Sequence, residues 1–137
     1  MADIEKFSAA VKEGYTFKGE SFKIGGAVLD GKVVPGADVS IPLKTMNRHG
    51  LIAGATGTGK TKTLQMLSEG LSDASVPVLL MDIKGDLSGI AAAGTINDKI
   101  KDRCQQLNVN YTPAAYPAEL LTLSNQKGTR LRATVSE

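Results

Sequence analysis

Gly-Ala-Thr-Gly-Thr-Gly-Lys-Thr, residues 54–61, is the stretch that decides how this chain folds. It is a complete match to the phosphate-binding loop pattern G-x-x-x-x-G-K-[ST]. The three glycines let the backbone curl, so that consecutive N–H groups can point at phosphate oxygens. The Lys60 ammonium is expected between the β- and γ-phosphates, and the Thr61 hydroxyl can bind Mg²⁺. The stretch therefore predicts a site for a nucleoside triphosphate.

The segments on both sides of the loop support this interpretation. Residues 49–53 form a short apolar run, and residues 61–71 carry leucines at the spacing of one helix face. A strand, a glycine loop and a helix in this order place phosphate at a helix N-terminus, where the dipole and free N–H groups favour anions. A dinucleotide fingerprint would need glycine at position 62, where lysine stands. The predicted nucleotide-binding residues are consecutive: Gly54, Ala55, Thr56, Gly57, Thr58, Gly59, Lys60, Thr61 and Lys62.

Composition sets limits on the class of protein. The chain has 137 residues, of which 42% are apolar, enough for the core of one domain. Its 16 basic and 14 acidic residues give a net charge of +2, which is no evidence for a general polyanion-binding surface. The single cysteine, Cys104, excludes an internal disulfide and suits a reducing compartment. No apolar run approaches a membrane span or a leader segment, so we expect a cytoplasmic protein without membrane contact.

The N-terminal third has its own pattern. Residues 2–13 predict an amphipathic helix, and residues 15–43 contain short β-like runs separated by glycine-containing turns. Asp30-Gly31, between two apolar runs, is a hairpin signal. We therefore predict two domains: residues 1–46 hold a helix and a small antiparallel β-layer, and residues 47–137 belong to the nucleotide-binding core.

The remaining sequence predicts an α/β core. Residues 76–81 are a continuous apolar run, typical of a parallel strand that is buried on both faces. Together with residues 51–53 and the helix between them, this run predicts a right-handed βαβ unit. Residues 97–107 predict a helix with Cys104 on its apolar side. Residues 119–135 predict a closing hairpin.

Asp82 follows the apolar run at the position of a Walker B aspartate. Two roles stay open: a Mg²⁺ ligand, directly or through water, or a carboxylate at the strand end beside the nucleotide, which we favour. A solvated strand-end carboxylate without a role stays open for Asp86, four residues later, more than for Asp82. No Asn-Lys-x-Asp motif for reading guanine is present, and no apolar run followed by Asp-Glu comes after Asp86. No catalytic residue is assigned.

Three stretches carry a resemblance to a known family: residues 47–61, 79–88 and 130–137. They resemble the HerA-like bacterial ATPase and helicase family, in the FtsK–HerA group of P-loop NTPases. The resemblance begins near residue 20 and corresponds to the N-terminal portion of the ATPase. It implies a RecA-like parallel sheet with flanking helices, of which this chain would hold an incomplete core. It also implies ATP and Mg²⁺ as cofactors, movement on DNA as a hexameric homo-oligomer, and a possible nuclease partner.

Two other functions stay open. A small P-loop phosphotransferase would usually carry substrate-reading arginines after the second strand, and only Arg103, Arg130 and Arg132 follow it. A nucleotide-binding module that does not hydrolyse ATP would fit the missing catalytic glutamate. For the helicase-type ATPase, the same absence predicts poor turnover by this chain alone.

Overall fold

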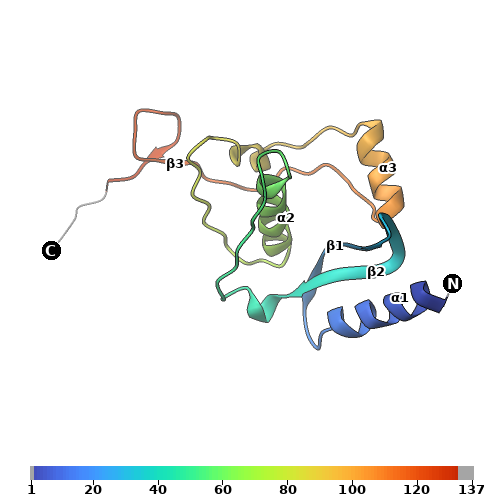
Figure 1. The fold of residues 1–137 in the computed structure, drawn as a ribbon. Helices are drawn as coiled ribbons and strands as arrows, with labels where there is room; N and C mark the ends of the chain where they lie inside the picture. The colour runs from blue at the N-terminus through green and yellow to red at the C-terminus, as the bar shows by residue number, and fades with distance from the viewer. Residues whose placement is uncertain (1, 133–137) are drawn as a thin grey trace.

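The computed structural model describes residues 2–132, which form a small α/β protein (Figure 1). It begins with α1 (Ala2–Tyr15) and an antiparallel hairpin of β1 (Ser21–Leu29) and β2 (Lys32–Pro42). A 3-10 turn, η1 (Leu43–Thr45), then leads toward α2 (Lys60–Asp73). The later elements are short and run in the order η2 (Ser88–Ala91), α3 (Asp98–Leu107), β3 (Leu121–Thr122) and β4 (Thr129–Arg130). The α/β class and the small antiparallel layer are confirmed.

The hairpin turns at the predicted place. Asp30 and Gly31 have φ angles of 49° and 75°, so both lie in the left-handed region that a two-residue type I′ turn requires. Pairing runs from Leu29 opposite Lys32 at the turn to Ser21 opposite Pro42 at the open end. The hairpin prediction is therefore confirmed.

The hairpin is the platform on which the three α-helices gather. Helix α1 packs against β2, where Ala37 is fully buried and Val34 is nearly so. The C-terminal part of α2 lies against β1, since a Cβ added to Gly70 would stand 2.6 Å from the Phe22 ring. The end of α3 also reaches β1, because the Lys23 Nζ donates to the Leu107 carbonyl at 2.9 Å.

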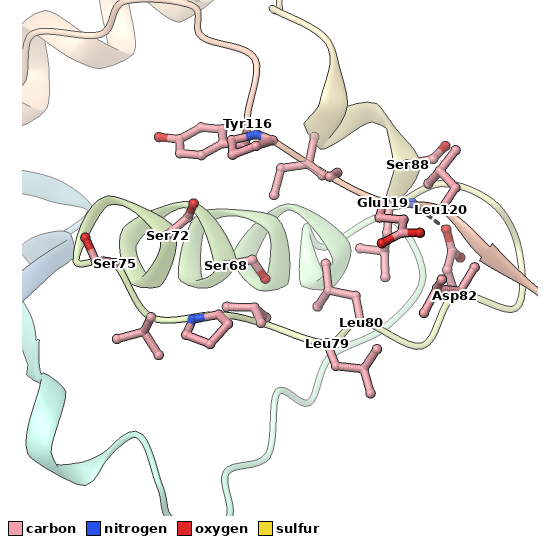
Figure 2. A pocket seen from close by; sticks show the side chains of 18 residues that line it. Ser68, Ser72, Ser75, Leu79, Leu80, Asp82, Ser88, Tyr116, Glu119 and Leu120 are labelled. Carbon is pink, nitrogen blue, oxygen red and sulfur yellow. Dashed lines mark hydrogen bonds between the residues drawn. The ribbon is translucent and has the colours of Figure 1, made fainter. Parts of the chain in front are cut away.

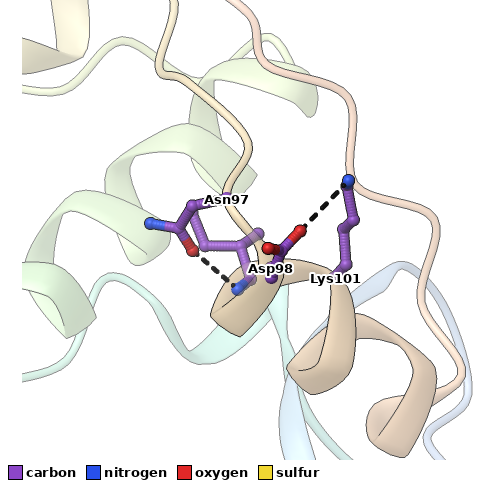
Figure 3. Close-up of polar contacts among 4 residues, drawn as sticks. Asn97, Asp98 and Lys101 are labelled. Carbon is purple, nitrogen blue, oxygen red and sulfur yellow. Dashed lines mark hydrogen bonds and ion pairs between the residues drawn. The ribbon is translucent and has the colours of Figure 1, made fainter.

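Helix α3 starts where its sequence places a cap (Figure 3). The Asn97 Oδ1 accepts from the Ile100 N–H at 3.0 Å, which satisfies one of the free donors of the first turn. Asp98 pairs with Lys101 at 3.4 Å on the exposed side. Cys104 is half-buried, as expected for a residue on the apolar side of the helix.

The predicted parallel sheet is not found among residues 2–132. Residues 51–53 and 76–81, expected as its two strands, carry no strand pairing and flank α2 as irregular chain. A strand needs a neighbour to accept and donate its backbone hydrogen bonds, and neither run has one here. Leu51, Leu79 and Met81 are 89%, 80% and 89% exposed, so these apolar residues lack the burial that their composition predicts.

The prediction of a closing hairpin is also wrong. Strands β3 and β4 pair in parallel, with Leu121 opposite Thr129 and Thr122 opposite Arg130. The chain between them loops back far enough to bring the second strand alongside in the same direction. The pairing is two residues long, and residues 133–135 of the predicted hairpin lie outside the described residues.

Candidate nucleotide-binding site

The glycine loop precedes α2, and its glycines have separate structural reasons. Gly57 and Gly59 have φ angles of 81° and 95°, which residues with a Cβ rarely adopt. Gly54 has a different role: a Cβ there would stand 2.6 Å from the Thr58 hydroxyl oxygen. The loop could not keep this shape with larger residues at these three positions.

The loop ends at the N-terminus of α2. Gly59 is the N-cap residue and offers no side-chain cap to the helix. The first N–H groups of a helix have no acceptor within it, and the helix dipole adds a partial positive charge at this end. Lys60, Thr61 and Lys62 form this first turn, so the end of the helix is suited to an anion.

The Ala55 carbonyl is the centre of the loop's hydrogen bonds. It accepts from the Thr58 N–H at 3.4 Å, from the Thr58 hydroxyl at 2.8 Å and from the Lys60 Nζ at 2.7 Å. The last contact folds the lysine side chain back over the loop. The place of the ammonium between the β- and γ-phosphates stays a prediction.

The turn after Asp82 faces the first turns of α2. The Asp86 Oδ2 lies 3.5 Å from the Thr61 hydroxyl, at the long limit of a hydrogen bond. The Gln65 Nε2 donates to the Asp86 carbonyl at 3.0 Å, and Gln65 is only 6% exposed. The carboxylate beside Thr61 is therefore that of Asp86, for which the sequence analysis assigned no role.

The Asp82 carboxylate is engaged with its own turn. Its Oδ1 accepts from the N–H groups of Lys84 at 3.1 Å and Gly85 at 2.8 Å, and its Oδ2 accepts from Leu87 at 2.8 Å. These bonds lower the pKa of Asp82 below its ordinary value, and the bond from the Leu87 N–H is the largest cause. Asp82 thus shapes the turn that presents Asp86, and its role as a Mg²⁺ ligand stays a prediction.

A cavity of about 640 Å³ lies beside α2, away from the phosphate loop (Figure 2). Four segments line it: the serine-bearing side of α2, residues 75–80 with Asp82, residues 87–90 and residues 116–121. Tyr116 closes one end, where its hydroxyl donates to Asp73 at 3.1 Å and partial burial raises its pKa. Residues 54–62 do not line this cavity, so the predicted phosphate site is the open surface of the loop.

Residues 2–132 hold no group of three or more His, Cys, Asp or Glu side chains that could bind a metal ion by themselves. In the same part of the chain, every helix is too short or too polar to cross a membrane.

Comparison with known proteins gives one match. A family model described as "Helicase HerA-like C-terminal" matches residues 29–137, which is most of the chain. The matched region includes the glycine loop, α2 and the turn from Asp82 to Leu87. No curated protein and no solved structure matches significantly. Because the description names a C-terminal region, the assignment of this chain to the N-terminal portion of an ATPase stays a prediction.

Proposed function

This chain belongs to the HerA-like helicase family, and on that basis we propose that residues 54–62 bind the phosphates of ATP together with Mg²⁺. The observation that carries the proposal is the combination of loop and helix. A glycine loop with two left-handed residues leads into a helix N-terminus without a side-chain cap, and a lysine lies over it. These are the features from which a phosphate cradle is built.

Each residue type has a defined part in this proposal. Backbone N–H groups at the start of α2 hold phosphate oxygens, and the Lys60 ammonium neutralises charge between the β- and γ-phosphates. Thr61 supplies a hydroxyl for Mg²⁺. The donor set fits the metal, because hydroxyl, carboxylate and phosphate oxygens are its preferred ligands. With no guanine-reading motif, we expect ATP to bind at least as well as GTP.

The wider activity follows from the family. We propose that the chain is part of an ATPase that moves on DNA as a homo-oligomeric ring, with a nuclease as a possible partner. The residues of this chain support the nucleotide site more directly than the DNA contact, since the net charge of +2 does not define a DNA-binding face. The division into residues 1–46 and 47–137 is part of the same proposal.

Substitution of Lys60 tests the nucleotide site. Lys60→Ala should weaken binding of a fluorescent ATP analogue by roughly 10- to 100-fold, because a charge-assisted hydrogen bond contributes about 1.5–3 kcal/mol. Lys99→Ala is the matched control, since Lys99 is exposed on α3 and away from the loop. Competition with unlabelled ATP and GTP would measure the base preference. Equal affinity of Lys60→Ala and Lys99→Ala would refute the assignment.

A further inference from the structure

In the turn after residue 81, the Asp86 carboxylate faces Thr61 at the end of the phosphate loop. The family assignment does not explain this contact. We propose that Asp86 joins Thr61 in binding the Mg²⁺ that accompanies the nucleotide. The inference rests on the proposed function, because it concerns the metal of that same site. Asp86 would thus be the Mg²⁺ ligand. The position of Asp82 at the end of the apolar run had suggested this role for Asp82.

The distance between the two side chains suits a shared ion. The Thr61 Oγ1 and the Asp86 Oδ2 are 3.5 Å apart. Two oxygens that each lie about 2.1 Å from one Mg²⁺ can be separated by at most about 4.2 Å. The pair therefore needs no large rearrangement to meet one ion. Thr61 is also the hydroxyl residue of the phosphate-loop pattern, so the ion would lie next to the phosphates.

Gln65 holds Asp86 in this place. Its side chain is 6% exposed in the second turn of α2, where the Nε2 donates to the Asp86 carbonyl at 3.0 Å. The Oε1 of the same side chain accepts from the Lys62 Nζ at 2.8 Å. Leu87, next in the chain, is 6% exposed and anchors the turn on the protein. Gln65 is therefore a positioning residue that joins the phosphate-loop helix to the acidic turn.

The alternative carboxylate is less available. Both oxygens of Asp82 accept backbone N–H groups of their own turn, from Lys84, Gly85 and Leu87. Binding of a metal by Asp82 would have to replace these bonds. Asp86 is exposed, and within residues 2–132 no basic side chain forms an ion pair with it. Its charge is thus free to face a cation.

The test is the Mg²⁺ dependence of nucleotide binding by the full chain. Affinity for a fluorescent ATP analogue is measured over a Mg²⁺ titration, and again with a chelator, for wild type, Asp86→Asn and Asp98→Asn. Asp98→Asn is the matched control, since it makes the same chemical change at an exposed position on α3 (Figure 3). Asp86→Asn should need roughly 10- to 100-fold more Mg²⁺ for half-maximal binding, as for other changes around metal ligands. Its affinity in chelator should equal that of wild type.

A second measurement uses the wild-type chain alone. Mn²⁺ added with the nucleotide should broaden the NMR signals of the Thr61 and Asp86 amides before that of Asp98. An unchanged Mg²⁺ requirement in Asp86→Asn, or broadening that omits Asp86, would overturn the inference while leaving the nucleotide site intact. Failure of the wild-type chain to bind the analogue at all would instead refute the proposed function, and this inference with it.

Discussion

At the scale of single residues, Asp82 organises more of the site than its exposure suggests. One carboxylate orders the chain from residue 84 to residue 87 through three backbone hydrogen bonds. Such bonds favour the charged form, which is why the pKa of Asp82 is lowered, with the Leu87 N–H as the largest cause. The order of the turn is therefore linked to the ionisation of one group.

This linkage gives a prediction for pH. The pKa of Asp82 is lower in the folded chain than its ordinary value of 3.8, so its contribution is fully present above about pH 4 and is lost as the pH falls through the lowered value. The amide proton signals of Gly85 and Leu87 should titrate together, with a midpoint below 3.8. Asp82→Asn should abolish this titration, whereas Asp98→Asn should leave it intact. A midpoint above the ordinary value would contradict the hydrogen-bonded turn.

Sequence reasoning singled out the loop residues and Asp82, and it did not single out Asp86 as the carboxylate near Thr61, for one physical reason. The loop glycines and Lys60 form a contiguous pattern, and the required φ angles at Gly57 and Gly59 are local properties. The contact between Asp86 and Thr61 depends on how a turn folds back on α2, which involves the buried Gln65. The spacing of Asp82, Gly85 and Asp86 hints at a turn in which a side chain bonds nearby backbone. It does not say which carboxylate faces the loop.

At the scale of elements, the contact between α2 and the hairpin depends on one missing side chain. Gly70 lies in the third turn of α2, and the Phe22 ring of β1 fills the space that a Cβ would take, at 2.6 Å. A glycine within a helix costs about 0.5–1 kcal/mol relative to alanine. The close approach of helix and strand is what this glycine makes possible.

The Gly70 contact can be tested by making the same glycine-to-alanine substitution at Gly70 and, as a control, at Gly14. Gly70→Ala should destabilise the chain by about 1–3 kcal/mol, because the Phe22 ring must shift to admit the methyl group. Gly14→Ala, in α1 with open space around it, should instead be neutral or stabilise by up to about 1 kcal/mol. Urea unfolding followed by circular dichroism measures both. Similar changes in the two variants would mean that Phe22 does not press on α2.

Elements were predicted well where their causes are local. The helices at residues 2–15, 60–73 and 98–107 follow from apolar spacing, the last also from its Asn97 cap, and the hairpin follows from Asp30-Gly31. The parallel strands were not found, because the apolar run at residues 76–81 specifies a strand only if partners exist on both sides. Among the described residues, the run at residues 76–81 has no partner strand on either side. The direction of the pairing between β3 and β4 was wrong, since β-like composition does not determine direction.

At the scale of the whole molecule, the main feature is how little of the apolar surface is covered. Val34, Ala37 and Leu87 are the buried apolar residues of the described chain. Large side chains after α2 face outward instead, among them Leu79 and Met81, and Ile83 is fully exposed. A continuous apolar segment without strand partners is prone to pair with another chain.

We therefore expect the isolated chain to associate as its concentration rises. Sedimentation velocity at increasing concentration should show this, and Leu79→Ser should reduce it, because it breaks the apolar run at residues 76–81. Leu123→Ser is the control: it makes the same change at a side chain of similar exposure, 76% against 80%, between polar neighbours. A wild-type chain that stays monomeric throughout, or an equal effect of both variants, would contradict the expectation.

The bond from Lys23 to the end of α3 joins residues that are 84 positions apart. Closing a flexible loop of that length costs about 4 kcal/mol of chain entropy, more than one hydrogen bond of about 0.5–1.5 kcal/mol returns. The contact between Phe22 and Gly70 reduces this deficit in part, because it leaves a loop roughly half as long for α3 to close. Halving a loop lowers the closure cost by about 0.6 kcal/mol. The docking of α2 on the hairpin thus favours the docking of α3, and the two helices join the platform cooperatively.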